Sequence, residues 1–166
     1  MGKGDKELDK RVDAAAGKIG ACPLYVDDTQ DLSIFDFKSK LKRLVEEHGI
    51  KLAIIDYVQL MRGGRWYMDE ELMAALKDTA SELGVAIIAL YQMGRSIFPE
   101  DDVRDSSEVK WAEKYADVML VYQPDKSKRW EDIEWDAKIY VMKNNKGKRL
   151  GDCDMKIKKG AVYGFN

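Results

Sequence analysis

The sequence predicts an α/β fold in which a mainly parallel sheet is followed by a C-terminal antiparallel β-meander. Two apolar segments, 52–57 and 85–91, each follow an amphipathic helical pattern, and this alternation is typical of parallel sheets. After about residue 123, three strand-like segments are joined only by turn residues, as in a meander. We expect one domain over 1–166, with an N-terminal helix (1–20), an α/β core (21–123) and a β-meander (124–166).

Length and composition limit the classes of function. A chain of 166 residues with 45% hydrophobic content has enough apolar residues for one domain with a core. The 28 Lys and Arg residues are balanced by 30 Asp and Glu, so nucleic-acid binding would have to come from local patches. Cys22 and Cys153 lack the C-x-x-C spacing, and two cysteines are too few for a disulfide scaffold. With no apolar run near the roughly 20 residues that span a bilayer, we expect no membrane segment and a cytoplasmic protein.

The first half of the chain contains two helical patterns and one strand. Leu8, Val12 and Ile19 recur at helical spacing and predict a helix over 6–20. Residues 23–27 predict a short strand. Ser33, followed by Asp36 three positions later, predicts a capped helix that stops at Gly49. Its apolar face contains Phe37, Leu41, Leu44, Val45 and His48. Strand 52–57 follows.

The second half begins with a helix from about 69 to 83, whose stripe is Leu72, Leu76, Ala80 and Leu83. The nearly uninterrupted apolar run 85–91 predicts a strand that is buried on both faces. A short helix near 107–115 and a strand over 117–122 come next. The meander is expected to contain strands 134–143, 152–158 and 161–165.

Two polar side chains come at the carboxyl ends of the apolar strands, where open α/β sheets bind ligands. Asp56 at the end of the first strand is interpreted as a magnesium carboxylate, or as a strand-end Asp that caps a turn. Gln92 ends the next strand and would lie beside Asp56 if the two strands pair. Its amide would then face the place of a terminal phosphate, whereas the alternative is an exposed strand-end Gln.

Other candidate residues have simpler explanations. His48 is the only histidine, and its place on a helical stripe favours a packed or hydrogen-bonded structural role over catalysis. Arg62, Arg65 and Trp66 share a glycine-bearing loop that offers cations for phosphates and a ring for base stacking. The loop 126–130 and the segment 156–159 add local positive charge. Each of these patches is either a DNA contact or an ordinary solvated surface.

Five segments, taken in order, resemble the C-terminal RecA-like motor domain of DnaB-type replicative DNA helicases, with coverage from about residue 6 to the end. The Ile-Asp-Tyr-Val-Gln-Leu-Met segment is similar to the family's Walker-B strand, and Gln-Met-Gly-Arg-Ser is similar to its Gln-Leu-Ser-Arg-Ser motif. The five segments are 23–29, 55–61, 92–96, 116–120 and 143–147.

The resemblance implies a partial RecA-like three-layer core, assembly into a ring of six, and ATP hydrolysis with magnesium between neighbouring subunits. Single-stranded DNA would pass through the central pore. By position, Asp56 would be the catalytic magnesium carboxylate, Gln92 the phosphate-sensing amide, and Lys143 a basic residue that reaches the adjacent subunit's site. The residues expected to face DNA are Arg62, Arg65, Trp66, Arg95 and Arg104.

The sequence also departs from the family. The pattern G-x-x-x-x-G-K-[ST] is absent from the 166 residues. The family's catalytic Glu lies upstream of anything present here, and Asn145 stands at the place of its arginine finger. We therefore expect a truncated motor domain, the distal part of a helicase motor that is not active as this chain alone. The alternative is a catalytically dead module that binds single-stranded DNA or a helicase partner.

The missing phosphate-loop strand has a consequence for assembly. In RecA-like cores that strand is central, so its loss is expected to expose the apolar edge of 85–90. Exposed sheet edges recruit other chains. We therefore expect self-association, or pairing with a complementary helicase chain.

Overall fold

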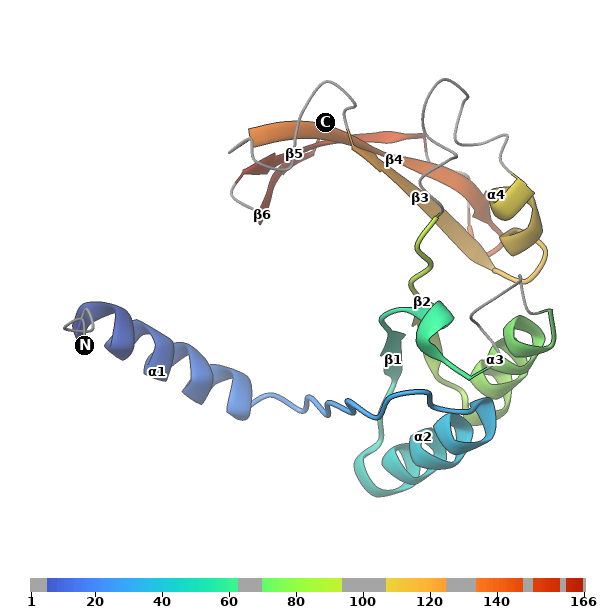
Figure 1. Ribbon diagram of the computed structural model, residues 1–166, viewed down its shortest axis with the longest axis horizontal. Coiled ribbons are helices and arrows are strands. Elements are labelled where there is room, and N and C mark those ends of the chain that lie inside the picture. The colour runs from blue at the N-terminus through green and yellow to red at the C-terminus, as the bar shows by residue number, and fades with distance from the viewer. Residues whose placement is uncertain are drawn as a thin grey trace. The chain divides into compact units, whose positions relative to one another are not determined.

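The structure is a computed structural model that describes residues 6–62, 70–93, 107–124, 134–147, 151–158 and 161–165 (Figure 1). It divides into two compact units, residues 1–30 and 31–166, which are treated separately below. Four of the residues predicted to face DNA, Arg65, Trp66, Arg95 and Arg104, lie outside the described residues.

The first unit contains one helix, α1 (Lys6–Gly20), as predicted. None of its residues is buried, and the apolar side chains Leu8, Val12 and Ile19 are all more than half exposed. The strand predicted over 23–27 is wrong, because this segment has no regular structure and Val26 is 83% exposed. A strand requires a hydrogen-bonded neighbour, and the described part of this unit contains no other strand.

The second unit begins with the predicted capped helix, α2 (Ile34–His48). Ser33 Oγ accepts a hydrogen bond from the backbone N–H of Asp36 at 3.1 Å, which satisfies one of the free donors at the helix start. Gly49 ends the helix with φ of 66°, a conformation that glycine adopts at little cost. His48 is exposed rather than packed in a core, and its Nε2 lies 3.7 Å from Glu47 Oε2, a contact that fits the other form of the predicted structural role.

Two short parallel strands follow α2 in the second unit. They are β1 (Leu52–Ile55) and β2 (Ala86–Ala89), paired in register from Leu52 with Ala86 to Ile55 with Ala89. The 3₁₀ helix η1 (Val58–Leu60) and the helix α3 (Glu70–Leu83) connect them. The predicted elements are confirmed, although both strands are shorter than the apolar runs that predicted them.

Helices α2 and α3 lie beside each other next to the β1–β2 pair (Figure 1). The buried core on this side is Ile55, Val58, Met61, Leu72 and Leu76. The opposite face of the strands is open: Ile54 is 61% exposed, and Leu52, Ile88 and Leu90 are exposed with it. Burial of 85–91 on both faces is therefore wrong, because among the described residues the helices cover only one face.

The remaining elements form an antiparallel sheet in the order β3-β4-β5-β6, which confirms the meander (Figure 1). These strands are β3 (Val118–Pro124), β4 (Glu134–Asn144), β5 (Cys153–Lys158) and β6 (Ala161–Phe165), preceded by the helix α4 (Ser107–Ala112). Val109 of α4 packs on Val121 of β3, and both are buried. The fold is thus a mixture of helices with parallel and antiparallel strands. A mainly parallel sheet is wrong for the described residues, because β3 pairs with β4 rather than joining β1 and β2.

Candidate functional site

Asp56 comes immediately after β1 and is exposed. Hydrogen bonds between the two chain segments continue on both sides of it. The Leu90 N–H donates to the Ile55 carbonyl at 3.0 Å, and the Val58 N–H donates to the Leu90 carbonyl at 2.9 Å. The peptide bond between Asp56 and Tyr57 is cis. The predicted pairing of the two strands is confirmed, so Asp56 and Gln92 follow neighbouring strands at the same edge.

Gln92 is tied to the segment after Asp56 by the side chain of Gln59. The Gln59 Nε2 donates to the Gln92 carbonyl at 2.7 Å, and the Gln92 N–H donates to Gln59 Oε1 at 3.3 Å. Both bonds use the backbone of Gln92, so its side-chain amide is not consumed by them. Sequence reasoning gave Gln59 no role. The sequence feature that could have identified Gln59 is its position three residues after Asp56, in a segment that must lie beside the next strand.

Lys143 is half-buried on β4, opposite Met119 of β3. Its Nζ donates to the carbonyl oxygen of Glu113, just after α4, at 2.6 Å. Two residues later, the backbone N–H of Asn145 donates to the Asp117 carbonyl at 2.8 Å. The position of the Asn145 backbone is therefore fixed against the start of β3, while the residue itself is exposed.

Asp117 joins α3 to the start of β3 and the end of β4. Lys77 Nζ lies 3.2 Å from one carboxylate oxygen, and Lys146 Nζ lies 4.0 Å from the other. The hydrogen bond from Lys77 holds the pKa of Asp117 below its ordinary value, with the charges of Lys146 and Lys143 acting in the same direction and burial opposing them. This partly exposed cluster gathers three lysines near Asn145.

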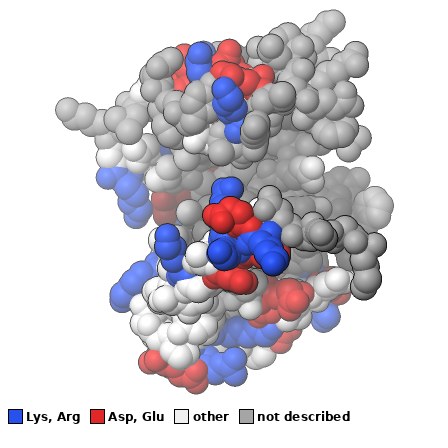
Figure 2. Space-filling view, turned by 90° about the vertical axis from the view of Figure 1, so that its left-hand side faces the viewer, with Lys and Arg blue, Asp and Glu red and all other residues white. Residues whose placement is uncertain are grey.

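Arg62 is the one predicted DNA-facing residue within the described part of the chain. Its side chain is 67% exposed, with Nε 3.4 Å from Asp31 Oδ2, and its backbone N–H donates to the Leu32 carbonyl at 3.0 Å. Figure 2 shows positive and negative side chains interspersed on one face of the described residues. On that face, no sign of charge prevails over a wide area, as the near-neutral composition predicts.

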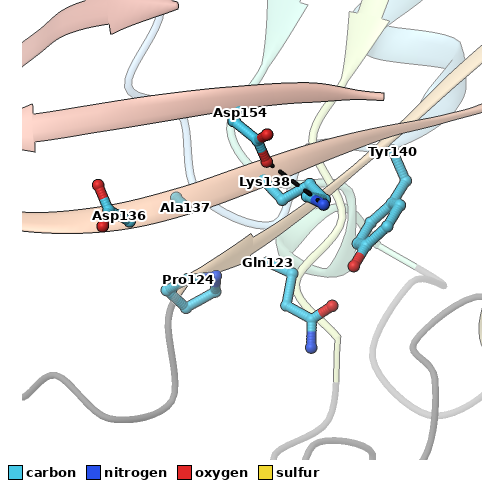
Figure 3. Close-up of a pocket in the computed structure, with 7 residues that line it drawn as sticks. All are labelled: Gln123, Pro124, Asp136, Ala137, Lys138, Tyr140 and Asp154. Atoms are coloured by element: carbon cyan, nitrogen blue, oxygen red, sulfur yellow. Dashed lines mark ion pairs between the residues drawn. The ribbon is translucent and has the colours of Figure 1, made fainter. Parts of the chain in front are cut away.

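A shallow pocket of about 400 Å³ lies on the meander, and none of the predicted site residues lines it (Figure 3). Lys138 and Asp154, which are register partners on β4 and β5, form an ion pair at 3.3 Å in its lining. The pocket is lined by Gln123, Pro124, Asp136, Ala137, Lys138, Tyr140 and Asp154. Lys138 and Asp154 neutralise each other and Asp136 adds one negative charge, so the lining offers no excess positive charge to hold an anionic ligand.

The described residues contain no group of three or more His, Cys, Asp or Glu side chains able to hold a metal ion. A single strand-end carboxylate such as Asp56 forms no group of that size. This is compatible with magnesium–nucleotide sites, in which one or two carboxylates bind the ion together with substrate phosphates and water.

A carboxylate at the carboxyl end of a parallel strand occurs in many α/β proteins, and comparison with known families shows to which of them this chain belongs. Residues 2–163 match the model of the DnaB-like helicase C-terminal domain, which is nearly the whole chain. The chain belongs to this family. The match includes Asp56, Gln92 and Lys143, although it does not test their roles.

Curated relatives agree with this assignment to the DnaB family. The chain is 31% identical over 144 residues to the replicative DNA helicase DnaB of Geobacillus stearothermophilus, covering 80% of this chain and 32% of that protein. The Mycobacterium leprae DnaB is 30% identical over 145 residues, or 78% and 23% of the two chains. The Leifsonia xyli subsp. xyli DnaB is 36% identical over 122 residues, or 65% and 26%. The chain thus spans a quarter to a third of the length of these relatives.

Within the part of the chain that the structure describes, no helix combines the length and the apolar character that crossing a bilayer requires.

Proposed function

We propose that this chain is the distal part of a DnaB-like replicative helicase motor, in which Asp56 is the magnesium-associated carboxylate and Gln92 the phosphate-sensing amide. The observation that supports this proposal is the parallel pairing of β1 with β2, which brings both residues to one edge of the sheet. DnaB helicases use ATP and magnesium. Asp56 would hold the ion there, and Lys143 would act toward a neighbouring subunit after leaving the Glu113 carbonyl.

ATP turnover in this proposal needs a second polypeptide segment. The 166 residues contain no phosphate-loop pattern, and that loop supplies most of the contacts to the nucleotide phosphates in related motors. The open face of β1 and β2 provides apolar surface for a complementary chain or for another copy of this one. Both partners are consistent with a family that forms oligomers.

The proposal is tested in a chimera in which this chain replaces the matching 144-residue region of the Geobacillus stearothermophilus DnaB. The rest of that helicase would supply the upstream phosphate loop and catalytic Glu that the family resemblance implies. We expect the chimera to bind ATP in the presence of magnesium and to hydrolyse it slowly, because Asn145 cannot replace an arginine finger.

A second candidate function is a catalytically dead module that binds single-stranded DNA or docks on a helicase. Asn145 favours it, because an amide does not supply the positive charge that an arginine gives to a phosphoryl-transfer transition state. Of the residues expected to face DNA, Arg62 is the one that the structure describes, and its positively charged side chain is exposed.

Binding of a labelled single-stranded oligonucleotide over a salt series tests this second function. We expect affinity to fall as salt rises, because each neutralised phosphate contributes about −0.7 to the slope of the logarithm of the binding constant against the logarithm of the salt concentration. Arg62→Met should reduce that slope, whereas Lys42→Met on α2, which removes a cation paired with Glu46, should leave it unchanged. Binding that is absent, or independent of salt, would exclude single-stranded DNA as the ligand of this second candidate function.

A further inference from the structure

The side chain of Gln59 continues the hydrogen bonding between two strands beyond the point where the first strand ends. Within the ladder, Leu90 uses its backbone N–H to bond Ile55 and its carbonyl to bond Val58. At that point β1 has ended and the chain turns into η1. The next backbone groups on the second strand that face this side belong to Gln92, and the Gln59 amide bonds both of them.

The chemistry of this contact explains why the residue is a glutamine. A side-chain amide has one carbonyl acceptor and an NH₂ donor in the same plane, so it can bond the backbone N–H and C=O of one residue at the same time. Gln59 Nε2 donates at 2.7 Å, and its Oε1 accepts at 3.3 Å. A carboxylate would keep the acceptor but lose the donor, and an apolar side chain of similar length would lose both.

We propose that Gln59 is a positioning residue for Gln92. It fixes the Gln92 backbone relative to the segment that carries Asp56, so that the carboxylate and the amide at the two strand ends keep a constant spacing. This proposal rests on the function assigned above to Gln92. Gln59 itself acts through Gln92 and requires no contact with nucleotide.

The first test is made on the chain itself, by NMR-detected hydrogen exchange of the Gln92 backbone N–H. Gln59→Met should increase that exchange by about 2- to 10-fold, the range expected for one exposed hydrogen bond. Gln59→Glu should leave it nearly unchanged at neutral pH, because an acceptor oxygen remains. Gln123→Met, a matched change on β3, should have no effect. Equal exchange in Gln59→Met and the parent chain would overturn the proposal.

The second test uses ATP hydrolysis by the chimera described above. Gln59→Met should lower kcat with little change in KM, and it should cause no further loss when Gln92→Ala is already present, because both changes remove one function. An equal additional loss in the Gln92→Ala background would show a merely structural role and overturn the proposal. If Gln92→Ala alone has no effect, the role assigned to Gln92 is wrong, and the positioning role of Gln59 is wrong with it. This holds even where the exchange result shows that Gln59 bonds the Gln92 backbone.

Discussion

Replacing Asn145 with Arg is expected to raise ATP hydrolysis by the chimera by a large factor, since arginine fingers contribute roughly 10³–10⁵ in rate in related phosphoryl-transfer enzymes. The backbone at this position is already anchored, because the Asn145 N–H donates to the Asp117 carbonyl at 2.8 Å. The substitution therefore adds the missing charge at a fixed place on the chain. Asn145 is exposed, so the longer side chain meets no buried neighbours.

Steady-state ATP hydrolysis at saturating magnesium measures this effect. Asn145→Gln is the matched control, because it lengthens the side chain without adding charge, and it should hydrolyse ATP as slowly as the parent chimera. Asn145→Lys should give a smaller gain, since an ammonium lacks the planar fork of a guanidinium. A chimera with Asn145→Arg that assembles and binds ATP but is no faster than the parent would show that this position does not serve a neighbouring site.

The second large effect is expected on self-association. The open face of β1 and β2 exposes Leu52, Ile54, Ile88 and Leu90, with Ile54 paired opposite Ile88 in the register. Burying a side chain of this size contributes about 1.5–3 kcal/mol, or roughly 10- to 150-fold in a dissociation constant. We expect the chain to associate with itself as concentration rises, and Ile54→Lys to weaken that association by at least about 10-fold.

Sedimentation velocity or light scattering over a concentration series measures the association. Phe35→Lys is the control, because Phe35 on α2 is 76% exposed and lies outside the β1–β2 face. It should change the association much less than Ile54→Lys. A chain that stays monomeric at the highest concentration, or two variants with equal effects, would rule out this face as the contact.

The elements that sequence predicted correctly are those whose signals are local. The helix from Ile34 is specified by Ser33, Asp36 and Gly49, all within or next to it. The meander is specified in the same way, by turn residues between apolar runs. These predictions do not depend on which segments later become neighbours.

The failures depend on partners that are distant in the chain. Residues 23–27 have a strand-like composition, but they form a strand only beside another strand. The run 85–91 is apolar enough for burial on both faces, yet one face is open because no described helix covers it. The role of Gln59 was not predicted for a related reason, since its two hydrogen bonds to Gln92 form only when β1 and β2 pair.

The central claim, that Asp56 is the carboxylate of a DnaB-like magnesium–nucleotide site, is tested most directly by Asp56→Asn in the chimera that also carries Asn145→Arg. Loss of one preorganised electrostatic contact costs about 10²–10³ in kcat, so magnesium-dependent ATP hydrolysis should fall by at least about 100-fold. Asp28→Asn, at an exposed Asp in the first unit, should have no effect. Hydrolysis at the parent rate in Asp56→Asn would contradict the claim.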